Sequence, residues 1–251
     1  MKKLKLMTIV GTRPEIIRLS ETIKKCDQYF DHILVHTGQN WDYTLNQVFF
    51  EDLELREPDY YLDTVGKDLG ETMGNIIAKS YEVIQKEQPH ALLILGDTNS
   101  AMSAISAKRL KCPIFHMEAG NRCWDWNVSE MINRKIVDHI ADINLPYTEH
   151  SRRYLISEGI DGKTIFVTGS PMQEVLQANM DKIKQSDVLE RLNLEKGKYI
   201  LVSAHREENI DNEENFMEFK FSRIYKLLTS WMSRIYNWHL ILLCYIIYRI
   251  H

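Results

Sequence analysis

The chain has 251 residues and a formal net charge of −4, with 44% apolar and 26% charged residues, a mixture typical of a soluble globular protein that argues against a disordered or a fibrous one. The slightly acidic balance gives no indication of nucleic-acid binding. The four cysteines show no CxxC spacing, which argues against a zinc knuckle and a disulfide framework and fits a reducing cytosol.

Short apolar segments alternate with amphipathic ones along the body of the chain. The first is too short for a signal peptide and is expected to be a strand. Strands are predicted at Lys5–Val10, Asp31–Thr37, Ala91–Leu95, Pro113–Met117, Ile143–Leu145 and Thr164–Thr168. Helices are predicted at Ile16–Cys26, Glu71–Glu87, Ser100–Leu110, Glu130–Ile140, His150–Glu158 and near Glu174–Ile183. This alternation is typical of a parallel, doubly wound, Rossmann-like α/β sheet.

The alternation ends at about residue 175 and restarts near Lys198. A strand at Tyr199–Ser203 and a helix at Asn212–Glu218 are expected to open a second domain. The sequence therefore predicts an N-terminal domain over residues 1–175, and a linker helix with the first βα unit of an incomplete domain over 176–220.

The last segment, residues 221–251, differs in composition from the rest. It has no Asp, Glu, Gly or Pro and four basic residues. Its longest apolar run is about half of the ~20 residues that a membrane span needs. Two interpretations stay open: a membrane-surface or partner segment, or non-native sequence produced by a frameshift or premature truncation. The second is favoured.

The first strand ends in Gly11-Thr12-Arg13-Pro14-Glu15, a glycine turn that leads into a helix. Thr12 is a candidate N-cap, and Pro14 suits the first helical turn. Free backbone N–H groups and the positive end of the helix dipole suit a phosphate or another anion, and Arg13 adds a permanent charge. A plain turn with a surface arginine explains the segment equally well.

Two carboxylates follow the next two central strands. Asp97 stands where a catalytic carboxylate would lie, although capping of the next helix by Asp97 or Thr98 is the commoner role for such a residue. Glu118 ends a strand in a partly apolar setting that favours proton transfer. The alternative for Glu118 is a structural ion pair with Arg122.

Two further segments carry candidate acid–base groups. Glu130 and Arg134 share one face of a helix, where a stabilising i,i+4 pair is the alternative explanation. His205 and Arg206 follow the strand Tyr199–Ser203 and suit a diphosphate or a leaving group, unless the histidine is structural. Three carboxylates and one histidine at strand ends or in adjacent loops favour acid–base chemistry.

Taken in order, seven motifs resemble the non-hydrolysing UDP-N-acetylglucosamine 2-epimerase family, over about residues 4 to 217. The motifs are Gly11-Thr12-Arg13-Pro14-Glu15, Thr37-Gly38-Gln39, Gly96-Asp97-Thr98, His116-Met117-Glu118-Ala119-Gly120, Glu130 with Asn133-Arg134, Thr168-Gly169-Ser170-Pro171, and His205-Arg206-Glu207. The resemblance implies a two-domain fold like that of the GT-B glycosyltransferases, with the sugar nucleotide between the domains.

The resemblance also implies an isomerase that needs no cofactor and no metal. A base removes the proton at C2 of a UDP-N-acetylhexosamine while UDP leaves C1, and UDP then adds back as C2 is reprotonated on the opposite face. By resemblance, Asp97, Glu118, Glu130 and His205 are the catalytic residues. The segment Gly11–Glu15, with Arg13 on the nucleotide, is expected to bind substrate, as are Arg18, Arg134 and Arg206. Arg18 stands where many members have a lysine.

Some positions depart from the family pattern. Asn40 replaces a histidine found in a regulatory region, so such regulation is not expected. The family's Pro-Glu-Glu run reads Ser129-Glu130-Met131. The segments Gln39–Tyr43 and Asn121–Cys123 resemble a subgroup that forms UDP-N-acetyl-L-fucosamine for capsule or O-antigen from a UDP-2-acetamido-2,6-dideoxy-L-talose-type sugar.

The resemblance ends soon after Glu214, and three hypotheses therefore stay open. The chain is an active isomerase, an inactive truncated remnant, or one half of a GT-B-type glycosyltransferase, of which the last fits the candidate residues poorly. The expected location is the cytoplasm, with a nucleotide sugar as partner and no nucleic acid or membrane. The intact family is expected to form homodimers.

Overall fold

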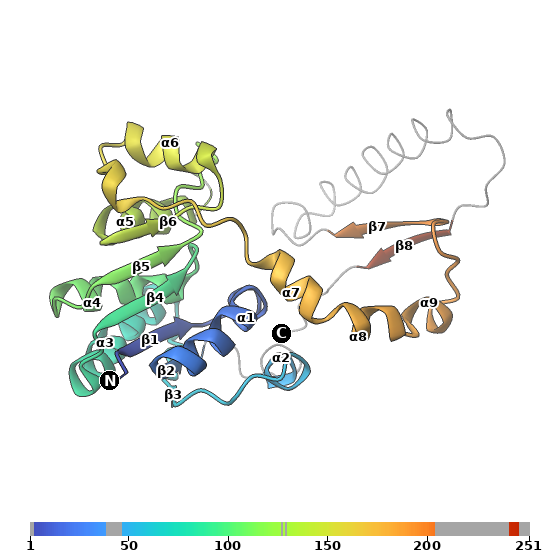
Figure 1. Ribbon diagram of the computed structural model, residues 1–251, viewed down its shortest axis with the longest axis horizontal. Coiled ribbons are helices and arrows are strands. Elements are labelled where there is room, and N and C mark those ends of the chain that lie inside the picture. Colours follow the sequence, from blue (N-terminus) through green and yellow to red (C-terminus); the bar gives the residue numbers. More distant parts are fainter. Residues whose placement is uncertain (1–2, 39–46, 127, 129, 204–240, 246–251) are drawn as a thin grey trace. The chain divides into compact units, whose positions relative to one another are not determined.

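The computed structural model describes residues 3–38, 47–126, 128, 130–203 and 241–245 (Figure 1). The chain divides into two compact units, Met1–Met180 and Asp181–His251. The strands of the first unit are β1 (Lys5–Val10), β2 (Asp31–His36), β3 (Tyr60–Tyr61), β4 (Ala91–Leu95), β5 (Ile114–Met117) and β6 (Ile143–Leu145). Its helices are α1 (Arg13–Tyr29), α2 (Gln47–Asp52), α3 (Leu69–Glu87), α4 (Ser103–Arg109), α5 (Glu130–Ile140), α6 (Glu149–Ser157) and α7 (Met172–Ala178), with the 3₁₀ helices η2 (Asn99–Met102) and η3 (Gly162–Thr164).

The strands of the first unit form one parallel sheet in the order β3-β2-β1-β4-β5-β6. The predicted doubly wound α/β fold is confirmed. The strand order reverses direction between β1 and β4, and ligands of such sheets bind beyond the carboxyl ends of the strands at that point. The segments that follow β1, β4 and β5 are therefore the first place to look for a functional site.

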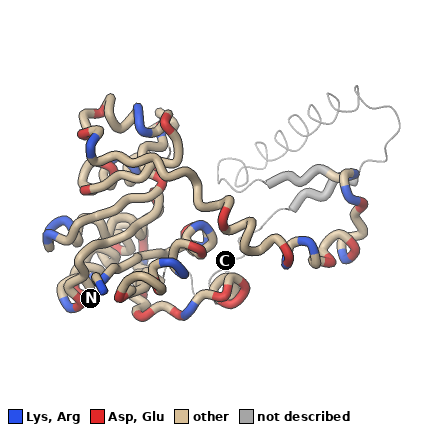
Figure 2. Tube along the Cα trace, viewed as in Figure 1, with Lys and Arg blue, Asp and Glu red and all other residues tan. Residues whose placement is uncertain are grey.

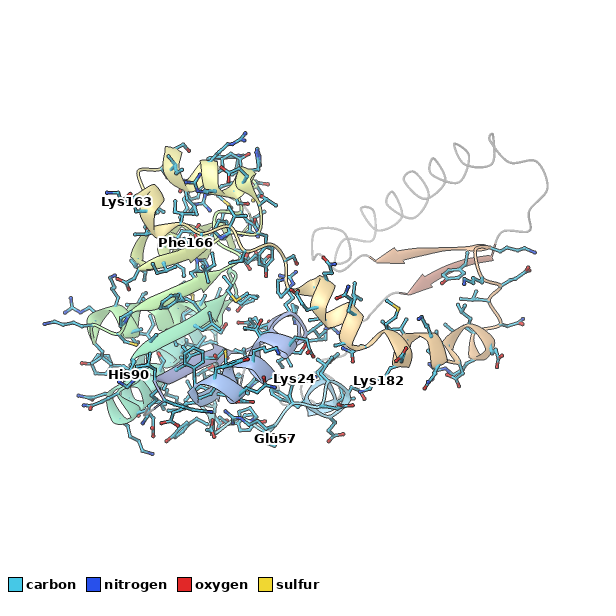
Figure 3. The ribbon with its side chains drawn as sticks, viewed as in Figure 1. Lys24, Glu57, His90, Lys163, Phe166 and Lys182 are labelled. Carbon is cyan, nitrogen blue, oxygen red and sulfur yellow. The ribbon has the colours of Figure 1, made fainter. Side chains whose placement is uncertain are left out.

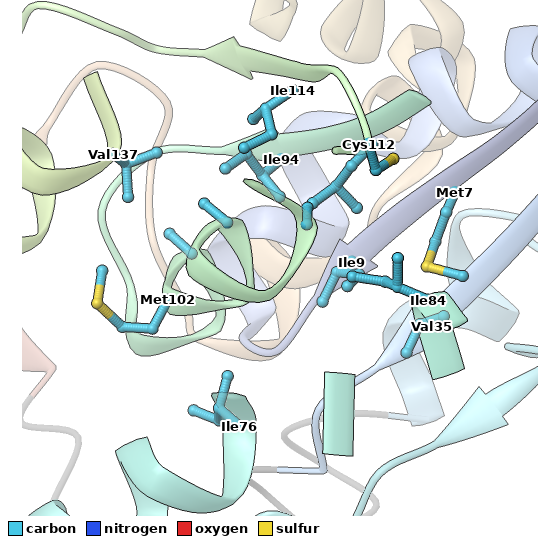
Figure 4. Close-up of a cluster of buried hydrophobic side chains, with 14 of the residues drawn as sticks. Met7, Ile9, Val35, Ile76, Ile84, Ile94, Met102, Cys112, Ile114 and Val137 are labelled. Atoms are coloured by element: carbon cyan, nitrogen blue, oxygen red, sulfur yellow. The ribbon is translucent and has the colours of Figure 1, made fainter. Parts of the chain in front are cut away.

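Each face of the sheet has its own apolar core, because alternate residues of a strand point to opposite faces. Met7 and Ile9 of β1 pack with Ile76 of α3 and with Ala104 of α4 on one face (Figure 4). Leu6 and Val10 belong to the other face, whose core is completed by Ile16, Leu19 and Ile23 of α1 and by Phe50 of α2. Charged residues lie almost entirely outside these strands (Figure 2).

Capping residues fix the ends of the two longest helices. Thr12 is the N-cap of α1, with Pro14 in the first turn. Asp68 caps α3, where its carboxylate accepts the N–H of Glu71. Gln88 ends α3 in the left-handed conformation with φ of 48°. The N-cap of α1 fixes where that helix begins after β1, and the left-handed Gln88 fixes where α3 ends before β4.

The predicted strand at Thr164–Thr168 is wrong. Thr164 ends η3, and the following segment makes only an isolated bridge, between Ile165 and Asn144 of β6. Phe166 (Figure 3) donates its N–H to the Asn144 carbonyl but keeps 54% of its surface exposed. The Thr168 N–H donates to the Pro146 carbonyl at 3.0 Å, but Pro146 has no N–H to donate in return, so a full strand ladder does not form at this edge.

Other elements differ from the prediction in their bounds. The helix expected at Ser100–Leu110 begins as η2 and continues as α4, and the one expected near Glu174–Ile183 is divided into α7 and α8 (Met180–Gln185). The short elements α2 and β3 were not predicted, and α3 begins two residues before the predicted Glu71.

The second unit is described in part. It contains α9 (Val188–Arg191) and the parallel pair of β7 (Tyr199–Ser203) and β8 (Ile241–Tyr245). The strand at Tyr199–Ser203 has its predicted bounds, and β8 lies within the tail of unusual composition. The predicted helix Asn212–Glu218 lies outside the described residues. Among the helices in the described ranges, none has the length and apolar character to cross a membrane.

Candidate active site

Asp97 lies directly after the buried strand β4, in the turn that Gly96 opens with φ of 72°. Its carboxylate pairs with Arg134 of α5, whose Nε is 2.5 Å from Oδ2. Asn133 holds the same residue from another side, since its amide donates to the Asp97 carbonyl at 2.9 Å. The N-cap position of η2 belongs to Thr98. The capping role considered for Asp97 is therefore wrong, and its carboxylate is held by an arginine.

Glu118 lies after β5, the strand beside β4. Its backbone has φ of 63°, a left-handed conformation that is uncommon for a residue other than glycine and that concentrates at functional sites. Its Oε2 accepts from Arg18 of α1 at 2.5 Å, and its Oε1 accepts from Asn121 at 3.3 Å. Arg18, rather than Arg122, is thus the ion-pair partner of Glu118.

The register of the sheet brings the two carboxylates to the same edge. Leu95 of β4 pairs with Met117 of β5, and the Gly96 N–H donates to the Met117 carbonyl at 2.9 Å. A Cβ on Gly96 would lie 3.8 Å from Oε2 of Glu118. The side chain of Glu118 therefore lies over the turn that presents Asp97.

Tyr147 adds a phenol to this group, although the sequence did not single it out. It follows the carboxyl end of β6, and its hydroxyl is buried with no hydrogen-bond partner among the described residues. Burial raises the pKa of the Tyr147 phenol, and the nearby negative charge of Glu118 raises it further. Its position after a parallel strand, like that of Asp97 and Glu118, was the signal available in the sequence.

Of the two interpretations of the glycine turn after β1, the structure fits the plain turn better than the anion site. The N–H groups of Gly11 and Thr12, expected to be open to an anion, donate to Oε2 of Glu15 at 3.1 and 2.8 Å. The hydroxyl of Ser100 donates to the other oxygen of the same carboxylate. Burial raises the pKa of Glu15, and these hydrogen bonds oppose that shift. Glu15 therefore joins the β1 and β4 turns and satisfies donors that a phosphate would otherwise use.

The remaining candidates lie at different places. Arg13 is half-buried, with its guanidinium 5.9 Å from the centre of the Phe49 ring. Glu130 is exposed at the first position of α5, one turn before Arg134. His205 and Arg206 lie outside the described residues. Among the residues that the structure does describe, no three His, Cys, Asp or Glu side chains are arranged to hold a metal ion.

The geometry agrees with the comparisons to known proteins. The family profile described as UDP-N-acetylglucosamine 2-epimerase matches residues 23–241. The chain belongs to the UDP-N-acetylglucosamine 2-epimerase family.

Individual proteins of this family are similar to the chain over most of its length. A UDP-N-acetylglucosamine 2-epimerase homolog from Methanococcus maripaludis is 38% identical over 215 residues, which are 84% of this chain and 60% of that protein. The solved UDP-N-acetylglucosamine 2-epimerase of Rickettsia bellii is 49% identical, with a TM-score of 0.81 over 96% of this chain and 62% of its own.

A third epimerase structure is that of Methanocaldococcus jannaschii in complex with UDP-GlcNAc and UDP. It is 32% identical, with a TM-score of 0.80 over 95% of this chain and 65% of its own. The chain thus spans about 60% of the length of the curated relatives it matches.

Proposed function

We propose that this site inverts C2 of a UDP-2-acetamido sugar by elimination and re-addition of UDP. The observation that carries the proposal is the presence of Asp97 and Glu118 at adjacent strand ends, each oriented by its own arginine. They lie next to the point where the strand order of the sheet reverses, which is the usual position of a nucleotide in this class of fold.

The chemistry requires groups that accept and return one proton. A carboxylate removes the proton from C2, the electron pair of the C2–H bond forms the C1=C2 double bond, and the C1–O bond breaks with its electron pair leaving on UDP. Re-addition reverses these steps, with the proton delivered to the opposite face of C2. Asp97, Glu118, Glu130 and His205 are the proposed carriers. When the reaction runs in heavy water, deuterium from the solvent enters at C2 and can be detected in the product.

The proposed substrate is a UDP-N-acetylhexosamine. The support is the relative from Methanocaldococcus jannaschii, whose structure contains UDP-GlcNAc and UDP. Within that class we place the protein in the subgroup that forms UDP-N-acetyl-L-fucosamine for capsule or O-antigen, on the sequence resemblance carried by Gln39–Tyr43 and Asn121–Cys123. A cytoplasmic homodimer is the corresponding proposal for the intact protein.

The test is a hybrid protein in which residues 1–180 replace the equivalent part of the Rickettsia bellii epimerase, so that the site is measured in a chain of full family length. The hybrid is incubated in heavy water with UDP-GlcNAc and with UDP-2-acetamido-2,6-dideoxy-L-talose. Deuterium at C2 of either sugar is the expected result. A folded hybrid that exchanges neither sugar contradicts the proposed function.

A second candidate follows from the relative lengths of the proteins. The Rickettsia bellii chain contains a substantial region that the match does not cover. With a sugar nucleotide held between two domains, as the family resemblance implies, part of the diphosphate site would lie in that region. In that case the 251-residue chain is inactive by itself, since catalysis depends on preorganised charges around the leaving group. The same exchange assay on the 251-residue chain, beside the hybrid, distinguishes the two: exchange by both proteins rejects the inactive chain.

A further inference from the structure

A buried ion-pair cluster lies behind the candidate site, and its centre is Asp138 of α5. The Asp138 side chain is fully buried. Its Oδ1 is 2.9 Å from Nδ1 of His116, and its Oδ2 accepts from Arg122 at 2.8 Å. Arg122 also pairs with Glu158 at 2.6 Å. Buried charges are retained only where they are paired in this way, and this cluster lies next to two loops that carry carboxylates.

His116 connects the cluster to the Asp97 turn. The ring is 1% exposed, and its Nε2 lies 2.8 Å from the carbonyl oxygen of Gly96, the residue before Asp97. A carbonyl oxygen only accepts hydrogen bonds, so Nε2 carries a proton. Nδ1 lies at ion-pair distance from the carboxylate of Asp138 without an aligned hydrogen bond to it, and that negative charge favours a proton there as well. Burial by itself lowers the pKa of His116, but its interactions with Asp138 raise the pKa above its ordinary value.

Asp138 connects the cluster to the Glu118 turn from the other side. Its two carboxylate oxygens accept the N–H of Gly120 at 3.3 and 3.1 Å. His116 and Gly120 stand two residues before and two residues after Glu118. The carboxylate of Asp138 therefore contacts the chain both before and after Glu118, the residue with the left-handed backbone. Asn144 of β6 adds a bond to the Asp138 carbonyl at 2.9 Å.

We propose that His116, acting with Asp138, is a positioning residue that fixes Glu118 relative to Asp97. Its imidazolium donates from Nε2 to the Gly96 carbonyl in the Asp97 turn, and its charge pairs at Nδ1 with the carboxylate that accepts the Gly120 N–H. The ring does not touch the substrate. It sets the separation of two of the groups proposed to exchange a proton with C2, and in this sense the inference rests on the proposed function.

The first test uses the 251-residue chain and does not require catalysis. Nitrogen-15 NMR of the imidazole rings is expected to show both nitrogens of His116 protonated at neutral pH. Replacement by His116→Phe is expected to shift the amide signals of Asp97 and Gly120. The control is His90→Gln, because His90 is exposed where β4 begins (Figure 3). A ring with an unprotonated Nε2, or amides unchanged by His116→Phe, overturns the proposal.

The second test measures C2 exchange in the hybrid protein. Gln retains an N–H that can reach the Gly96 carbonyl, so His116→Gln is expected to keep kcat within about tenfold of the parent. His116→Phe is expected to lower kcat about 100-fold with KM unchanged, since misplacement of a reacting group by about 1 Å has that effect. Equal kcat for Phe and parent, per folded molecule, overturns the positioning role.

The two tests separate the two proposals. A hybrid without exchange contradicts the proposed function, and the NMR measurement then decides by itself whether His116 holds the two turns. A hybrid that exchanges while the His116→Phe variant keeps its kcat leaves the function in place and removes the positioning role.

Discussion

Replacement of Asp97 by Asn tests its role in proton transfer with little expected effect on folding. The Asp97→Asn variant keeps the shape of the side chain and can still accept from Arg134, but it cannot take a proton from C2. Its C2 exchange in the hybrid is expected to fall by about 100-fold or more, the usual contribution of a general base. The measurement is deuterium incorporation by NMR, with circular dichroism to verify folding.

The matched control for this variant is Asp31→Asn. Asp31 is exposed at the start of β2, far along the strands from the carboxyl ends. It is expected to leave exchange and stability unchanged. Exchange by Asp97→Asn at the rate of the control would exclude Asp97 as a proton carrier.

Glu158 gives a prediction about pH. Its hydrogen bond to Arg122 lowers its pKa from 4.5 to about 2. Because the folded pKa is the lower one, the stabilisation is fully present above the unfolded value and is lost as the pH falls toward 2. Relative to the parent, Glu158→Gln is therefore expected to lower the Tm at pH 7 and to lose this effect progressively below pH 4.5.

The control for the pH series is Glu149→Gln, which removes an exposed pair with Arg152. Pairs of this kind contribute little to stability, so a small change in Tm is expected. A difference between Glu158→Gln and the parent that stays constant from pH 7 to low pH would contradict the assigned pairing.

The positions of single site residues could be predicted from the sequence better than their partners. Asp97 and Glu118 follow apolar strands, and that local pattern is sufficient to bring them to one edge of a parallel sheet. The partner of Glu118 was wrong because Arg18 lies 100 residues away in the chain, and no local spacing encodes such a pair. Glu15 was expected among the substrate ligands, but its carboxylate is buried between the turns after β1 and β4 and accepts hydrogen bonds from both.

At the scale of elements, the turn after β5 depends on a glycine that is sterically required. Gly120 has φ of 79°, and an added Cβ would lie 2.5 Å from the carbonyl oxygen of Ser151 in α6. Gly159 has a similar φ of 93° but nothing within 4 Å. The pair therefore separates the cost of the backbone conformation from the cost of the contact.

Gly159→Ala is expected to lower the free energy of unfolding by about 1 kcal/mol, the cost of a left-handed alanine. Gly120→Ala is expected to lower it by about 3 kcal/mol or more, because α6 must also move. Urea denaturation measures both. Equal losses would mean that α6 yields without cost and that its contact with the Glu118 turn is loose.

Local patterns of apolar and polar residues were sufficient to predict several elements with their bounds. The strands Lys5–Val10, Ala91–Leu95 and Ile143–Leu145 and the helix Glu130–Ile140 have the predicted bounds. The short β3 was missed because two residues carry no periodic pattern. Its pairing comes from tertiary contacts, since Val35 of β2 aligns with Tyr60.

At the scale of the whole chain, the first unit contains extensive apolar cores on both faces of its sheet. Among the residues that the structure describes, all buried members of the three apolar clusters lie before residue 180. A fragment of residues 1–180 is therefore expected to unfold in one cooperative thermal transition, with a Tm within a few degrees of that of the 251-residue chain. Circular dichroism at 222 nm is the measurement. A fragment that melts gradually or fails to fold would show that the cores need residues beyond 180.

The strand order has a consequence for synthesis on the ribosome. β1 emerges first and occupies the middle, β2 and β3 join on one side, and β4, β5 and β6 join in turn on the other. Every new strand is added at an open edge, so none has to be inserted between two that are already paired. One edge of β1 therefore stays unpaired until β4 has been translated. During that interval the exposed edge of the partly formed sheet can pair with a strand of a neighbouring nascent chain.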